Sequence, residues 1–430
     1  SLRISQAKPL GDFFSFFIPR SDVIYYRPLG MQVPFFFLQK LFGVNPLPFH
    51  LVQLLTHAVN SILVYILVRL ILKKDTVALL ASFLYGTSSV HYIPFYWFAT
   101  YAFVLGPTLF FSSYIFFIRF LDKRKHVYFF LSFLFFTIGL FVNEMVIVAP
   151  FIFGLYIFIF RKKEAKKAFS LLPYGAIGLS FLILRFFVFP APTSGLYSLK
   201  IGKHVLNNLE AYFLWSFNWP EEMRAQLLNF VTVNPEFIKG FSNYYLIFVS
   251  SLLFFIVLWY IIPFILILVE KRKTVFPFIT FGLSWFIIGL LPVLFFQHHT
   301  FSYYLPISLV GFLIWSLSMF NVLLEKLQKK TFLRIFCIVL VMIVWLAVSV
   351  VTIDFNAKIH WAPRRAKQAK LLIEKAKQYY NPFSLELDIY VYPTSENKLS
   401  LNDQDAFKII FANEKVITQY TTEAETKEVL

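Results

Sequence analysis

The sequence has little charge and almost no cysteine. Only 15% of its 430 residues are charged, and its single cysteine, Cys337, lies in an apolar run without a partner in the chain. The sequence also lacks a GxxxxGK[ST] phosphate-binding loop and the patterns GxGxxG, HExxH and GxSxG. These absences argue against a soluble nucleotide-binding enzyme, a zinc protease of the common type and a serine hydrolase.

Apolar residues are abundant instead, at 58% hydrophobic and 20% aromatic. Water-soluble globular domains do not have this composition. Apolar stretches near or above the roughly 18 residues that mark a transmembrane helix recur along the chain. The sequence therefore predicts an all-α polytopic integral membrane protein with about ten transmembrane helices. The expected spans are 48–72, 76–92, 95–121, 127–142, 144–160, 169–190, 243–269, 275–296, 301–323 and 332–353.

The net charge of +17 comes from short basic turns between these spans. The alternate turns, near 92–94, 142–143 and 297–300, contain no Lys or Arg. This alternation is the positive-inside pattern, so we expect the basic turns in the cytoplasm and no nucleic-acid partner. The basic turns lie at Lys73-Lys74, Lys123–Lys125, Arg161–Lys167, Lys271–Lys273 and Lys326–Arg334.

The same pattern divides the chain into three parts. We expect residues 1–47 to lie along the outer membrane interface, as the remainder of a first outer loop. The chain begins without Met, so we expect its natural start, and a first span, upstream of Ser1. Residues 48–353 form the predicted transmembrane domain. Residues 354–430 are predicted to be a small soluble α/β tail on the outer face.

Local patterns add detail to two of these segments. In the outer loop 191–242, a helix is expected at 205–215, with Trp215 and Trp219 at the lipid headgroups. In the tail, 366–380 has the pattern of an amphipathic helix, while 385–392 and 406–412 alternate like strands.

The first span carries polar residues along one face. His50, Gln53, His57 and Asn60 fall within an arc of roughly 80° at helical spacing. They either bond neighbouring helices or line an aqueous or headgroup-filled cavity. We favour the cavity for His50 and not for Asn60.

Further polar residues stand at the expected outer ends of other spans. They are His91, Glu144, Arg185 and the pair His298-His299. Glu144 borders an apolar run with no basic residue nearby in sequence, so it needs a partner or a proton, unless it simply favours a helix N-terminus. The histidine pair is equally compatible with an ordinary wet turn and is only a weak indication of metal.

Arg27 stands between aromatic residues just before the first span. A guanidinium there is suited to gripping a phosphate bidentately, or it anchors the chain at the interface. Asp12 and Asp22 are the only carboxylates of the first 47 residues, and each is a weak candidate for a general base.

Several short motifs follow one another along the chain: Tyr26-Arg27-Pro28-Leu29, Phe42-Gly43, Pro48–Leu51, His57–Ser61, Leu84–Gly86 with His91 and Trp97, and Asn143-Glu144 with Pro150. Their order resembles the GT-C superfamily of membrane glycosyltransferases. The resemblance is closest to the branch of protein O-mannosyltransferases and transmembrane tetratricopeptide-containing O-mannosyltransferases, although the tail lacks the repeats. It is best over residues 25–160.

The resemblance implies transfer of a sugar from a polyprenyl-phosphate donor to a protein or glycan acceptor on the extracytoplasmic face. Such chemistry requires a carboxylate to activate the acceptor and a cation for the departing phosphate. In this superfamily the catalytic Asp lies in the first outer loop, so we expect it upstream of Ser1. Donor or substrate binding is assigned to Arg27, His50, His57, His91, Glu144 and Arg185.

The sequence does not decide whether a divalent metal takes part, and it favours a prokaryotic plasma membrane. Two other functions remain as alternatives. A lipid or solute transporter needs charges near mid-bilayer and inverted repeats, and the sequence shows few of the first and none of the second. A non-catalytic membrane scaffold would tolerate Ala at Arg27, His50 and Glu144.

Overall fold

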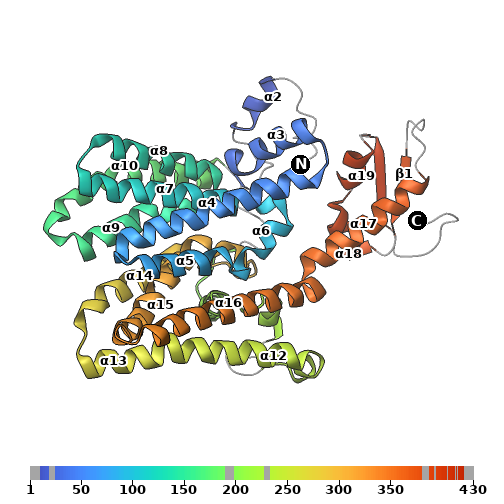
Figure 1. Cartoon of the computed structure of the whole chain (residues 1–430). Coiled ribbons are helices and arrows are strands. Elements are labelled where there is room, and N and C mark those ends of the chain that lie inside the picture. The colour runs from blue at the N-terminus through green and yellow to red at the C-terminus, as the bar shows by residue number, and fades with distance from the viewer. Residues whose placement is uncertain are drawn as a thin grey trace.

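The computed structural model describes residues 10–18, 25–188, 198–226, 233–379, 387–391, 394–403, 405–411, 413 and 415–420. Long helices pack side by side in a bundle, and a small separate lobe follows at one end (Figure 1). The bundle helices are α4 (Pro46–Leu72), α5 (Asp75–Gly86), α7 (Ala102–Lys123), α8 (His126–Val142), α9 (Ala149–Phe160), α10 (Leu172–Phe187), α12 (Pro235–Ile256), α13 (Ile262–Glu270), α14 (Phe276–Leu294), α15 (Pro306–Lys326) and α16 (Thr331–Ile359).

Shorter helices lie around and between them. Two precede the bundle, α2 (Leu10–Ser15) and α3 (Val33–Phe42), joined near the bundle by η1 (Pro28–Gln32). The others are η2 (Ser89–His91), α6 (Tyr92–Tyr96), η3 (Phe98–Thr100), η4 (Glu144–Val148), η5 (Lys162–Leu171), α11 (Lys203–Trp215), η7 (Glu222–Gln226), η8 (Val257–Ile261), η9 (Lys273–Val275) and η10 (Ser302–Tyr304).

Seven helices in the described part of the chain are long and apolar enough to cross a membrane. Two shorter apolar helices, His126–Val142 and Glu144–Phe160, lie among them. The prediction of a polytopic helical membrane protein is confirmed. The seven are Pro46–Leu72, Phe98–Lys123, Lys162–Phe187, Pro235–Glu270, Lys273–Leu294, Pro306–Lys326 and Thr331–Ile359.

One predicted span is shorter than expected. The helix expected at 76–92 ends at Gly86, so α5 has 12 residues and is about 18 Å long, well short of a ~30 Å hydrocarbon layer. Ser88 then caps η2 by accepting from the Val90 N–H, which starts a new direction. α5 is an inner helix, with Ala78, Ala81 and Leu84 fully buried.

Small residues let two helices approach closely. A Cβ at Gly282 of α14 would collide with the backbone nitrogen of Trp315, and one at Gly311 of α15 with that of Phe286. Close backbone approach through glycine is a common way to pack helices in membranes, where lipid provides little hydrophobic drive. Of the seven long apolar helices, α15 is accordingly the most enclosed, with 83% of its most apolar 18 residues buried.

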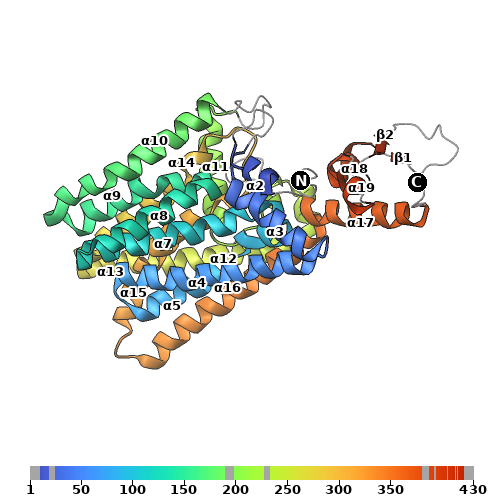
Figure 2. The same cartoon turned by 90° about the horizontal axis from the view of Figure 1, so that it is seen from above.

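The helix ends divide into two groups (Figures 1 and 2). At one end, called the basic end, lie the basic turns 72–75, 123–126, 161–171, 271–275 and 327–330. At the other, called the site end, lie the connections 87–101, 143–144 and 295–305 and the end of α16. The predicted polar candidates and the basic turns therefore lie at opposite ends of the bundle.

The small lobe has a two-stranded parallel sheet. α17 (Trp361–Tyr379) leads to it, and β1 (Leu387–Val391) pairs with β2 (Val416–Tyr420), with Leu387 opposite Val416. The prediction of a strand at 406–412 is wrong, because α19 (Asp405–Ile410) lies there after α18 (Thr394–Leu401). Parallel strands need a long crossover connection, and these helices supply it. Phe407, buried in α19, stacks on Phe411 one turn later.

The loop helix is confirmed, but its tryptophans are not at an exposed interface. α11 covers the expected segment, and the side-chain nitrogen of Asn208 donates to the carbonyls of Leu294 (2.9 Å) and Phe296 (2.8 Å). These bonds hold α11 against the end of α14. Trp215 and Trp219 consequently point into the protein, at 1% and 8% exposure, so their predicted place at the headgroups is wrong.

Candidate active site

The site end brings together two residues that are 117 positions apart. Nε of Arg27 donates to Oε2 of Glu144 at 2.7 Å, and Nη2 donates to the other carboxylate oxygen. Arg27 is 4% exposed, whereas the Glu144 side chain is 35% exposed. The pair is therefore a bidentate ion pair that the surroundings still reach from the Glu144 side.

Local structure explains why these residues face each other. α8 ends at Val142, and Asn143 caps the following turn by accepting from the Met145 N–H at 2.9 Å. The Asn143 amide also donates to the Ala102 carbonyl, which ties this turn to α7. Glu144 thus sits in the first turn of η4, where the helix dipole favours an acid. On the other side, Pro28 begins η1 directly after Arg27.

Aromatic rings enclose the guanidinium. The Arg27 carbon Cζ lies 4.5 Å from the centre of the Tyr25 ring and 4.7 Å from that of Phe103. Phe103 in turn contacts the rings of Tyr303 and Tyr304. Burial alone lowers the pKa of Arg27, but the Glu144 carboxylate outweighs burial and raises this pKa above its usual value. Arg27 remains charged although it is buried.

Two further polar residues complete this cluster. Arg185 of α10 is near enough for its charge to act on Glu144. Burial, with a smaller contribution from the Arg27 charge, lowers the pKa of His299 to about 4. His299 is thus neutral at pH 7. Arg185 thus adds positive charge beside the Arg27–Glu144 pair, and positive charge at a site attracts anions.

The bidentate geometry leaves part of Arg27 available. The pair uses Nε and Nη2, and among the described residues Nη1 has no hydrogen-bond partner. A phosphate oxygen could accept from Nη1 while Glu144 holds the other edge of the guanidinium. Such charge-assisted bonds are among the stronger hydrogen bonds in proteins.

The three histidines assigned to donor or substrate binding, His50, His57 and His91, make no hydrogen bond to this pair. His57 is 4% exposed and its Nε2 bonds the Gly86 carbonyl at 3.0 Å, while its ring lies 4.2 Å from that of His91, which is 2% exposed. Gln53 and Asn60, on the same face of α4, bond the carbonyls of Pro94 and Val104. This face joins helices, and the exposed His50 lies on the first turn of α4.

The two weak candidates for a base cannot be placed. Asp12 belongs to α2, but its side chain is not among those described, and Asp22 lies outside the described residues. In the described ranges, no group of three or more His, Cys, Asp or Glu side chains is arranged to hold a metal ion.

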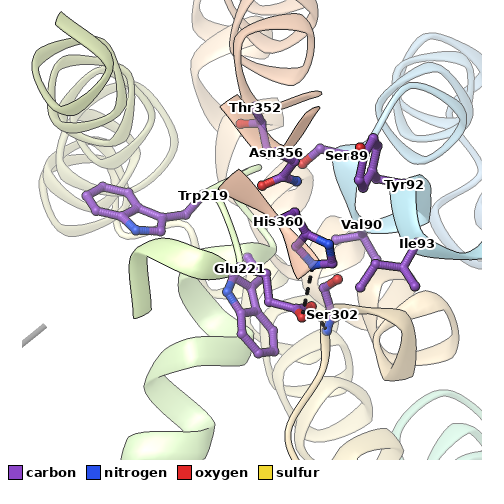
Figure 3. A pocket seen from close by; sticks show the side chains of 11 residues that line it. Ser89, Val90, Tyr92, Ile93, Trp219, Glu221, Ser302, Thr352, Asn356 and His360 are labelled. Carbon is purple, nitrogen blue, oxygen red and sulfur yellow. Dashed lines mark hydrogen bonds and ion pairs between the residues drawn. The ribbon is translucent and has the colours of Figure 1, made fainter. Parts of the chain in front are cut away.

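Sequence reasoning missed a second polar group at the same end (Figure 3). Glu221 accepts from the Ser302 N–H at 2.7 Å, and its other oxygen lies 3.4 Å from Nε2 of His360. Nδ1 of His360 accepts from the Ala362 N–H, so Nε2 carries the proton and donates to Glu221. The sequence signal is the same as for Glu144, because His360 is a titratable residue at the end of a long apolar helix.

The pocket around this pair is small. Its cavity volume is about 10 Å³, which leaves room for about one water molecule. Asn356 Oδ1, in its lining, has no hydrogen-bond partner within the described ranges. The neighbouring Glu222 accepts from the Trp361 N–H at 3.2 Å, so the acidic pair also caps the first turn of α17.

Comparison with known families finds a similarity over the first part of the chain. Residues 29–187 match the model of the dolichyl-phosphate-mannose-protein mannosyltransferase family. The match covers less than half of the chain, and this part is similar to a family of GT-C membrane glycosyltransferases. No curated protein matches the chain in sequence.

The mannosyltransferase match includes much of the cluster. Glu144 and Arg185 lie within the matched range, and Arg27 lies two residues before it. The resemblance drawn from short motifs is thereby confirmed, as is the prediction of a glycosyltransferase. The family uses a polyprenyl-phosphate-linked sugar as donor.

Proposed function

We propose that this protein transfers a sugar from a polyprenyl phosphate to a protein or glycan acceptor on the extracytoplasmic side. The observation that carries the proposal is the buried Arg27–Glu144 pair, with Arg185 close by, at the end opposite the basic turns. The positive-inside rule favours the cytoplasm for those turns and hence the outside for the pair.

The donor phosphate binds beside Arg27 and Arg185 in this proposal. The bond between the sugar anomeric carbon and the phosphate oxygen breaks, and a new bond forms from that carbon to the acceptor oxygen. The departing polyprenyl phosphate gains negative charge, which the two guanidinium groups stabilise. The acceptor proton passes to a carboxylate, and Asp12 and Asp22 remain the weak candidates within this chain.

Transfer of radiolabelled mannose from dolichyl-phosphate mannose tests the proposal directly. Membranes that contain the full chain are compared with membranes that contain equal amounts of the Arg27→Ala variant. The control is Arg69→Gln, which removes an exposed guanidinium paired with Asp75 at the basic end. We expect transfer by the wild type and the control and its loss in Arg27→Ala. Equal transfer by all three proteins would refute the assigned site.

A further inference from the structure

The basic end contains a cavity of its own. Its volume is about 330 Å³, in the range of small-molecule sites and far above that of the pocket beside His360. Three segments enclose it: the α4–α5 turn, the start of α14 and the last turns of α15. The proposed sugar transfer takes place at the opposite end of the bundle and does not use this cavity.

One wall of the cavity is a single face of α15. Ser318, Asn321, Val322 and Glu325 follow the spacing i, i+3, i+4, i+7. Ser318 is 4% exposed, and its hydroxyl has no hydrogen-bond partner among the residues that the structure describes. A buried hydroxyl without a partner is uncommon, and this one lies on the helix face that forms the cavity wall.

Two cations stand at the cavity wall. Lys74 and Arg272 both contact Glu325, with Arg272 Nη1 donating to Oε2 at 2.7 Å. Arg272 Nε also donates to Glu270 at 2.6 Å, and within the described ranges its Nη2 has no partner. Glu270 also pairs with Lys326, so three cations (Lys74, Arg272 and Lys326) and two carboxylates leave one net positive charge at this wall.

The remaining lining is apolar. Leu72, Val77, Phe278 and Val322 contribute hydrocarbon surface beside these charges. A free phosphate would use the cations and leave that surface without a partner. A basic pocket between helices at a membrane surface suits a lipid headgroup with part of its acyl chains.

We propose that this cavity binds one anionic phospholipid. Its phosphate accepts from Arg272 Nη2 and from Lys74. The first part of its acyl chains contacts Leu72, Phe278 and Val322. The bound lipid thereby links α5, α14 and α15 at the basic end.

Native mass spectrometry of the delipidated full chain tests this site. The probes are dioleoylphosphatidylglycerol, dioleoylphosphatidylcholine and inorganic phosphate at equal concentrations. We expect one phosphatidylglycerol to be retained at least about tenfold more tightly than phosphatidylcholine, and a loss of about tenfold in Arg272→Gln. Lys329→Gln, which removes a basic-end charge outside the lining, keeps wild-type retention.

A second variant covers the case in which Arg272→Gln disturbs the fold. Ser318→Leu fills the cavity while it leaves Lys74, Arg272 and Glu325 in place, and it is expected to abolish the tight lipid. Equal retention of the two lipids, or unchanged retention in Ser318→Leu, would overturn the proposal. Binding of inorganic phosphate without phosphatidylglycerol would assign the cavity to a free anion instead.

Discussion

At the scale of single residues, burial and pairing must be considered together for Arg27. A guanidinium that is 4% exposed has lost most of its hydration, so the Glu144 carboxylate and the two flanking rings stabilise it in place of water. Removing one partner leaves the other buried and uncompensated. This asymmetry makes the pair testable by stability as well as by activity.

We expect Glu144→Gln to destabilise the protein by about 2–3 kcal/mol, below the range for a fully buried pair because Glu144 is partly exposed. Thermal unfolding in nanodiscs measures the change. The double variant Arg27→Ala/Glu144→Gln completes a cycle with the single variants Arg27→Ala and Glu144→Gln. Strict additivity of the single effects would show that the two side chains are not coupled.

Arg27→Lys separates charge from geometry. Lysine keeps the positive charge but has a single nitrogen. It cannot bond both oxygens of Glu144 in one plane and also present another nitrogen to a phosphate. We expect kcat/KM for the lipid-linked donor to fall about 10- to 100-fold. An Arg27→Lys enzyme with wild-type kcat/KM would mean that only the charge matters.

His299 makes stability depend on pH. Its pKa is lowered from 6.5 to about 4 in the folded protein, so between these values the unfolded chain binds the extra proton. Stability due to this group is therefore present above pH 6.5 and lost as pH falls towards 4. We expect His299→Gln to reduce the fall in Tm over this interval. The adjacent, exposed His298→Gln is the matched control, and identical pH profiles for both variants would contradict the assignment.

The sequence named most of this cluster but not its connections. Arg27, Glu144 and Arg185 stand out because polar groups next to apolar runs are costly unless they have a use. The pairing of positions 27 and 144 depends on tertiary packing, which periodicity does not encode. Glu221 was missed because acids in polar loops are ordinary. Its importance comes from the distance to His360.

At the scale of elements, the α14–α15 contact leaves no room for added side-chain atoms at Gly282 and Gly311. We expect Gly282→Ala or Gly311→Ala to cost about 1–3 kcal/mol, because each added methyl group meets the backbone of the facing helix. Gly175→Ala in α10, where a Cβ meets nothing within 4 Å, is the control. Thermal unfolding that is equally unaffected by all three changes would mean that the helices separate easily.

Element positions were predictable to the extent that the bilayer imposes them. The length of an apolar run is tied to hydrocarbon thickness, so the long helices lie close to their expected positions. The end of α5 at Gly86 was not predictable from hydrocarbon thickness, because a helix that is largely enclosed by other helices need not cross the whole bilayer. The prediction of a strand at 406–412 was wrong because a short apolar run is compatible with either a strand or a helix. Here β1 and β2 pair in parallel, and the connection between them contains the helix.

At the scale of the whole molecule, the basic turns and the Arg27–Glu144 pair lie at opposite ends of the bundle. We therefore expect them on opposite sides of the membrane. In a Cys337→Ser background, we expect a cysteine at the exposed His50 to react with an impermeant maleimide added outside intact cells. A cysteine at the exposed Lys329 should react only after permeabilisation. The opposite pattern would place the site in the cytoplasm.

Because α5 is short, polar side chains of neighbouring helices bond the backbone carbonyls at its C-terminal end. The carbonyls at its C-terminal end receive hydrogen bonds from other helices: Gly86 from His57, Leu84 from Trp345 at 3.1 Å and Thr87 from Ser349. An abrupt helix end at membrane depth is tolerable only if such donors arrive. His57, which the sequence assigned to donor or substrate binding, thus caps the C-terminal end of α5 from α4, and Trp345 and Ser349 of α16 do the same.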